Sequence, residues 1–168
     1  MSTTPQTIRR ATADDVPAIL ALIRELAEYE KLLDACIATE SLLLEHLLGS
    51  SAAAESMVAL VDGKVVGYAI YFRTFSTFLA VPGLYLEDIY VQPTHRGGGL
   101  GKAMLVEICR IARQRGYGRV EWSVLKWNTP SIGFYESLGA VCMNEWQVYR
   151  LTGDALSKVA GQDVSSPQ

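Results

Sequence analysis

Apolar residues recur at helical spacing in the first third of the chain. A short strand is predicted over 7–10. The apolar positions after it predict a helix over about 12–31, with Thr12 or Asp14 as its cap. A second helix is predicted over 39–48, because a glycine follows it directly and glycine is a common helix stop.

The pattern changes to the alternation typical of strands in the middle of the chain. Strands are predicted over 57–61 and 65–72, joined by a tight turn at Asp62-Gly63. A further strand is predicted over 84–91. The aromatic stretch 73–83 has neither period, and an irregular connection is expected there.

Helical and strand patterns alternate again in the last third. A helix is predicted over 100–115, with its apolar residues on one face. A strand over 119–125, a short helix over 130–139 and a last strand over 146–151 follow. The order of elements is therefore strand, two helices, three strands, helix, strand, helix, strand.

This order predicts a mixed α/β (α+β) fold, in which helices are layered on one central sheet. No repeat or linker interrupts the pattern, so one domain is predicted over 1–160, with the polar residues 161–168 as a disordered tail. A chain of 168 residues with 49% hydrophobic and 20% charged residues suits such a domain.

Composition and charge exclude several classes of function. A net charge of -3 argues against nucleic acid as a partner, because phosphate binding needs a basic face. The three cysteines and two histidines lack metal-ligand spacing, so no metal is expected, and Cys109 is expected to be a buried thiol on the apolar side of its helix. The chain shows no signal-peptide or membrane-spanning stretch, which predicts a cytoplasmic protein without membrane contact.

The strongest local feature is the glycine-rich loop between the strand at 84–91 and the helix at 100–115. Glycines let backbone N–H groups approach a ligand, and the start of a helix carries unpaired donors. Basic side chains at both ends of the loop add charge, so a pyrophosphate cradle is predicted. Its residues are Arg96, Gly97, Gly98, Gly99, Leu100, Gly101 and Lys102.

Other readings of this loop fit the sequence less well. A dinucleotide fingerprint needs a different glycine spacing, and a P-loop needs Ser or Thr after its lysine, where this chain has Ala103. A flexible turn between strand and helix stays open as an alternative from the loop alone.

Three motifs in the same order resemble the GCN5-related N-acetyltransferases. Arg96-x-x-Gly99-x-Gly101 matches the R/Q-x-x-G-x-G/A signature of that family. The stretch 85–91 is similar to the strand before the signature, and 127–140 is similar to its C-terminal N-x-x-S/A-x-x-x-Y-x-x-x-G segment. The stretch 25–31 resembles the first helix of the diamine (spermidine/spermine) N-acetyltransferase branch.

The resemblance implies a mostly antiparallel sheet with helices on both faces, splayed between the strands at 84–91 and 119–125. It implies that acetyl-CoA binds in the splay. The backbone of Ile89, Tyr90 and Val91 would pair with the pantetheine arm, the glycine loop would hold the pyrophosphate, and Asn128 and Ser131 would contact the cosubstrate from the other side. A homodimer is also implied.

Amine acetylation needs a base, because an alkyl ammonium with a pKa of about 10.4 must lose a proton before it attacks a thioester. Glu87 is favoured for this role, and Asp88 is expected to be structural, because adjacent strand residues face opposite ways. The resemblance places the general acid at Tyr135. A backbone N–H in 89–91 can serve the oxyanion.

Five further residues are candidates for binding the amine. The resemblance places Tyr29 and Glu30 at this corner, although a solvated helix end is an equal alternative. Glu121 and Ser123 share one side of a strand, and Glu121 could instead pair with a surface arginine. Glu145 matches the branch only loosely.

The acceptor stays open between two kinds of primary amine. A diamine or polyamine fits the branch, but Lys31 stands where a more acidic run would help to hold a polycation. An amino acid or lysine analogue fits comparably. The alternatives from other classes are a non-catalytic acetyl-CoA-binding regulator and a nucleotide-binding module.

Overall fold

The computed structural model describes residues 6–162, which divide into two units at residues 123 and 124. The first unit contains a five-stranded sheet in the order β1-β2-β3-β4-β5. The first four strands run antiparallel, and β4 and β5 are parallel. The strands are β1 (Gln6–Arg10), β2 (Glu55–Val61), β3 (Lys64–Ser76), β4 (Val81–Val91) and β5 (Val120–Trp122).

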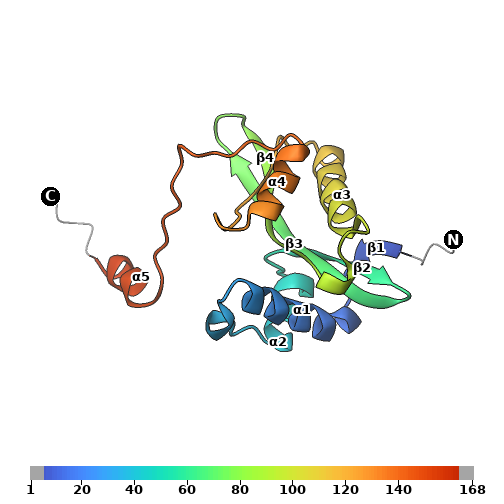
Figure 1. The fold of residues 1–168 in the computed structure, drawn as a ribbon. Coiled ribbons are helices and arrows are strands. Elements are labelled where there is room, and N and C mark those ends of the chain that lie inside the picture. Colours follow the sequence, from blue (N-terminus) through green and yellow to red (C-terminus); the bar gives the residue numbers. More distant parts are fainter. Residues whose placement is uncertain (1–5, 163–168) are drawn as a thin grey trace. The chain divides into compact units, whose positions relative to one another are not determined.

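Helices cover both faces of this sheet (Figure 1). The core on one face joins side chains of α1 to Tyr68, Ile70 and Tyr90 of the sheet. On the other face α3 buries a stripe that includes Met104 and Ile108. The helical elements are η1 (Ala13–Asp15), α1 (Val16–Tyr29), η2 (Leu33–Ala35), α2 (Glu40–Leu43), η3 (Leu44–Leu48), η4 (Pro93–His95) and α3 (Leu100–Gln114). The predicted mixed, mostly antiparallel fold is confirmed.

The second unit, described by itself, contains α4 (Thr129–Ser137) and α5 (Gly153–Ala160). The strand predicted over 146–151 is wrong: these residues form neither helix nor strand. A strand needs a neighbour for its backbone hydrogen bonds, and the described part of this unit contains no other strand. The prediction of one domain over 1–160 stays a prediction. Of the predicted tail, 163–168 lie outside the described residues.

The irregular connection predicted over 73–83 is also wrong. β3 continues to Ser76 and β4 begins at Val81, with Phe75 opposite Pro82 in the ladder. Pro82 and Gly83 resemble strand breakers in sequence. Gly83 lies in the sheet because β5 passes close by, and a Cβ there would stand 3.2 Å from the backbone oxygen of Arg119.

Two smaller predictions need correction. β5 is shorter than the predicted 119–125, since its ladder covers only Val120–Trp122. Cys109 is exposed, because it follows the buried Ile108 and a step of one residue turns a side chain by about 100° around a helix.

Candidate active site

The glycine loop forms an open cradle at the start of α3. Gly97 and Gly99 have φ values of 82° and 83°, a region that favours glycine. A Cβ at either position would meet no atom within 4 Å, so open space lies in front of both. Gly99 caps α3, and the buried Leu100 anchors the first turn. The loop therefore leaves room for a ligand in front of α3, and its role as an anion site stays a prediction.

The other loop residues lie around these two glycines. Gly98 and Lys102 are exposed, while Gly101 is half-buried, and a Cβ added there would stand 4.0 Å from a methyl group of Val91. Exposed donors and a cation at the start of a 15-residue helix suit a phosphate group.

The strand before the loop has one unpaired edge. The ladder between β4 and β5 ends at Leu86 opposite Trp122, and within the described first unit no strand continues it along 87–91. Gln92 donates its backbone N–H to Val66 on β3 at 2.9 Å, so by the alternation of an antiparallel ladder Val91 and Ile89 direct their backbone groups to the open edge. The resemblance placed its splay at this edge, and the splay itself stays a prediction.

A β-bulge interrupts β4 beside this open edge. Asp88 lies opposite Ile70 but Leu86 lies opposite Tyr71, so Glu87 is the extra residue. The bulge breaks the alternation on which the choice between Glu87 and Asp88 depended. Leu86 faces α3 and is buried, while Asp88 is turned to the α1 face, where Tyr68 lies.

Asp88 has the most perturbed carboxyl group of this region. The Tyr68 hydroxyl donates to its Oδ2 at 3.2 Å. Burial raises the pKa of Asp88 to about 6; the bond from Tyr68 lowers it, and the charges of Glu87 and Glu30 raise it. Burial also raises the pKa of Glu30. The sequence assigned four carboxylates to the acceptor, those of Glu30, Glu87, Glu121 and Glu145, but did not identify Asp88 as the buried one.

The predicted acceptor residues Glu121, on β5, and Ser123, just after it, each bond to another side chain. The Glu121 carboxylate pairs with Nε of Arg119 at 2.7 Å, which is the surface-arginine alternative named above. The Ser123 hydroxyl shares a 2.7 Å hydrogen bond with the hydroxyl of Tyr85. Ser123 therefore lies beside Tyr85 of β4, whereas the carboxylate of Glu121 forms an ion pair with Arg119.

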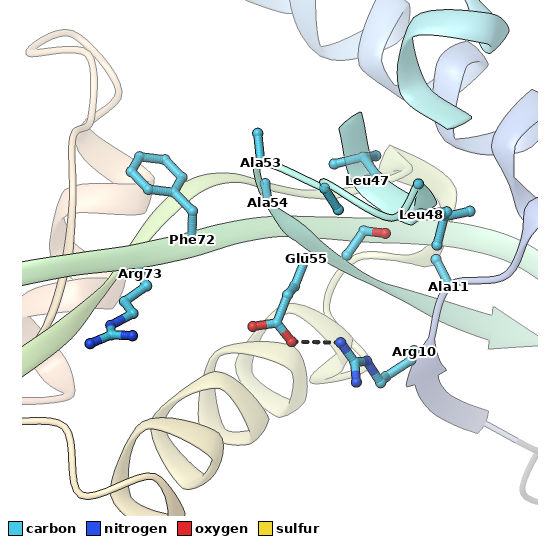
Figure 2. Close-up of a pocket in the computed structure, with 12 residues that line it drawn as sticks. Arg10, Ala11, Leu47, Leu48, Ala53, Ala54, Glu55, Phe72 and Arg73 are labelled. Carbon is cyan, nitrogen blue, oxygen red and sulfur yellow. Dashed lines mark hydrogen bonds and ion pairs between the residues drawn. The ribbon is translucent and has the colours of Figure 1, made fainter. Parts of the chain in front are cut away.

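A pocket lies further along β3 and contains none of the predicted site residues (Figure 2). Figure 2 shows Leu47 and Ala54 on one side of it and the ion pair of Glu55 with Arg10 on the other. Phe72 lines this pocket, and its ring centroid is 5.3 Å from that of Tyr85 on β4. The pocket therefore adjoins β4.

The second unit holds four of the predicted site residues. Asn128 accepts a hydrogen bond from the backbone N–H of Ser131 at 3.4 Å and so caps α4. Tyr135 lies on α4, and burial raises its pKa. Glu145 is exposed in a stretch without helix or strand. Their predicted roles stay predictions.

Across residues 6–162 no group of three or more acidic, histidine or cysteine side chains is arranged to hold a metal. Within the same range no helix has both the length and the apolar character to cross a bilayer.

Comparison with known proteins identifies the class. Residues 21–140 match the family model described as the Acetyltransferase (GNAT) family, and this match extends over both units. The chain therefore belongs to the GNAT family and is an acetyltransferase. Enzymes of this family use acetyl-CoA as cosubstrate.

Individual relatives place the chain near the diamine acetyltransferase branch. The chain is 36% identical to a thialysine N-epsilon-acetyltransferase of Bos taurus (92% of this chain, 97% of that one). It is 32% identical to an L-ornithine N5-acetyltransferase of Arabidopsis thaliana (90% and 86%). It is 34% identical to a spermidine/spermine N(1)-acetyltransferase-like protein of Homo sapiens, covering 93% of this chain and 24% of that one.

The solved structures agree with the fold. An integron cassette protein of V. cholerae superposes with a TM-score of 0.78 at 24% identity, over 96% of this chain and all of that one.

Proposed function

We propose that this chain transfers the acetyl group of acetyl-CoA to the side-chain amine of a small amino acid, such as a lysine analogue or ornithine. The observation that carries the proposal is the half-buried Asp88, which lies with Glu87 and Glu30 beside the open edge of β4. A carboxylate in this position suits an alkyl ammonium ion.

The cosubstrate is proposed to lie along the open edge. Backbone groups of Ile89 and Val91 can pair with the amides of a pantetheine arm, and Tyr90 lies between them. The loop from Arg96 to Lys102 would bind the pyrophosphate. When bound, acetyl-CoA supplies a thioester carbonyl that an amine can attack.

The bulge places Asp88 and Glu87 in different surroundings, so binding the ammonium ion and accepting its proton are proposed for different residues. Asp88, ionised at neutral pH with a pKa of about 6, holds the ammonium ion. The exposed Glu87 beside it is in contact with water and can accept the proton that leaves the amine. Glu30 adds negative charge to the same corner.

Tyr135 is the proposed acid for the leaving thiolate, with Asn128 and Ser131 as cosubstrate contacts. Burial raises the pKa of Tyr135, which keeps its hydroxyl protonated at neutral pH, as an acid requires. A Tyr135→Phe variant should fold and lose most of its turnover.

The acceptor class is supported by the relatives and by charge. Two of the similar proteins are named for amino acid or amino-acid-like acceptors, thialysine and ornithine. Lys31 directly follows Glu30, which favours an acceptor with its own carboxylate over a polycation. A diamine or polyamine is the second candidate, favoured by the human relative and the three carboxylates.

One assay tests the proposal. Purified protein is mixed with acetyl-CoA and thialysine, ornithine, lysine, putrescine or spermidine, and free thiol is followed. Turnover should be fastest with the amino acids. Turnover on spermidine alone would favour the second candidate, and binding of CoA without turnover on any amine would favour a non-catalytic regulator.

A homodimer is part of the proposal, supported by the exposed apolar tip of the β3–β4 hairpin. Phe75, Phe78 and Leu79 are 58%, 94% and 56% exposed. Light scattering should give twice the mass of one chain, and a Phe78→Asp variant should reduce it. The cytoplasmic location stays a prediction.

A further inference from the structure

Arg96, the first residue of the proposed phosphate loop, is held in place by its own chain. Its Nε donates to the backbone oxygen of Val91 at 2.8 Å. Its guanidinium carbon lies 5.5 Å from the ring centroid of Tyr29 and 5.2 Å from that of Tyr90. No carboxylate within residues 6–162 forms an ion pair with it. Its charge therefore remains available to an anion.

The same helix that supplies Tyr29 also fixes the other ring. The Tyr90 hydroxyl donates to Oε2 of Glu25 at 3.2 Å, and Nε2 of Gln92 donates to Oε1 at 2.9 Å. Glu25 and Tyr29 are four residues apart on α1 and so share one face. The last turns of α1 thus contact the strand end and the loop arginine together.

Glu30, which follows Tyr29 in the chain, lies near Asp88 at the proposed acceptor corner. Glu30 ends α1, and its charge acts on the carboxyl group of Asp88. Two adjacent residues therefore serve two regions: Tyr29 contacts the arginine of the phosphate loop, and Glu30 lies at the acceptor corner. The sequence had assigned both to the amine.

We infer that Tyr29 is a positioning residue for Arg96, and that through it pyrophosphate binding and amine binding favour each other. This inference rests on the proposed function. An anion bound to the guanidinium restricts the motion of Arg96, and the contact between Arg96 and Tyr29 then restricts the end of α1, which keeps Glu30 near Asp88. Such coupling is reciprocal, so a bound amine raises the affinity for CoA by the same factor.

Three variants test this. Tyr29→Leu removes the ring, Tyr29→Phe keeps it, and Tyr117→Leu removes a comparable ring, whose centroid lies 6.0 Å from the guanidinium of Arg115 at the end of α3. CoA affinity is measured by calorimetry with and without a saturating amine that the wild-type protein acetylates. Rates are measured with acetyl-CoA and with S-acetylpantetheine, which lacks the pyrophosphate.

Tyr29→Leu should weaken CoA binding by about three- to tenfold, the range of a partly exposed cation–π contact. It should abolish the gain in CoA affinity that the amine gives. Its kcat/KM should fall further with acetyl-CoA than with S-acetylpantetheine, because only acetyl-CoA carries the pyrophosphate that Arg96 is proposed to bind. Tyr117→Leu should resemble wild type, and Tyr29→Phe, which keeps the ring, should keep the gain in CoA affinity that the amine gives.

Equal losses with both donors would overturn the inference, because they would reveal a general structural role. Unchanged CoA affinity in Tyr29→Leu, or equal effects in Tyr117→Leu, would also overturn it while the proposed function stands. A wild-type protein that fails to bind CoA would instead overturn the proposed function itself.

Discussion

The phosphate loop and the acceptor corner are built from different kinds of information. The loop depends on backbone conformation. Two of its glycines have positive φ, and glycines are visible in the sequence. The acceptor corner depends on pairing, because a one-residue bulge decides that Asp88 faces Tyr68 rather than α3. The conformation of a backbone loop can be predicted from a motif, whereas the surroundings of a side chain such as Asp88 depend on the register of the sheet.

The largest effect should separate the two regions completely. Asp88→Asn removes the charge that holds the ammonium ion and should lower kcat/KM for the amine by about a hundredfold. CoA affinity should stay within about twofold, as calorimetry can show. A parallel loss of CoA binding would mean that the two regions do not act separately.

The converse change is Gly99→Ala. A side chain at φ 83° is strained, so CoA affinity should fall by about tenfold. The KM for the amine, measured at saturating acetyl-CoA, should change little. Gly133→Ala is the matched control, since this glycine lies inside a helix and no atom would meet its Cβ within 4 Å. Equal effects of the two substitutions would contradict a special role for the loop backbone.

The pH profile sharpens the comparison at the acceptor corner. The pKa of Asp88 is about 6, so the ionised form that holds the amine is lost as pH falls through 6. The titration of the amine affects wild type and Asp88→Asn equally, so it cancels when the kcat/KM of wild type is divided by that of the variant. It should fall by about tenfold between pH 7 and pH 5. A flat ratio would show that Asp88 does not act as an anion.

The same raised pKa predicts that the ionised Asp88 lowers the stability of the folded protein. A carboxyl group raised from 3.8 to about 6 on folding favours the folded state only while it is protonated, so stability is lost as pH rises between these values. At pH 7.5 Asp88→Asn should unfold at a temperature about 5 °C higher than wild type. At pH 3.5 the two melting temperatures should converge. Lower stability of the variant at pH 7.5 would contradict this account.

The smallest effect should come from Glu121, which the sequence also assigned to the acceptor. Its carboxylate pairs with Arg119 and both side chains are 40% exposed. Glu121→Gln should therefore change kcat/KM for the amine by less than about twofold. A loss of tenfold would place Glu121 back among the acceptor residues.

The sequence predicts those parts of the molecule that depend on local patterns. Apolar periodicity locates α1 and α3, and the glycines locate the loop that starts α3. It fails where a neighbour decides the outcome. Gly83 reads as a breaker but is a strand residue because β5 passes close to it. Residues 146–151 have a strand pattern but no strand beside them in the described second unit.

The site divides in the same way. The motif places Arg96 and the glycines correctly at the start of a helix. Nothing local predicts that the ring of Tyr29 meets Arg96, because these residues come together only when α1 packs on the sheet. Tyr68 was missed for a related reason, since a buried strand tyrosine has no signal that separates a partner of Asp88 from a core residue.

The bulge at Glu87 makes the length of β4 as important as its composition. Deletion of this one residue would remove more than a carboxylate. Every side chain from Leu86 back to the start of the strand, or from Asp88 to its end, would have to exchange faces. If the part before Glu87 shifted, leucines would leave the core under α3. If the part after it shifted, Asp88 would enter that core. Engineering of this enzyme should therefore keep the number of residues in β4, even where it exchanges single side chains.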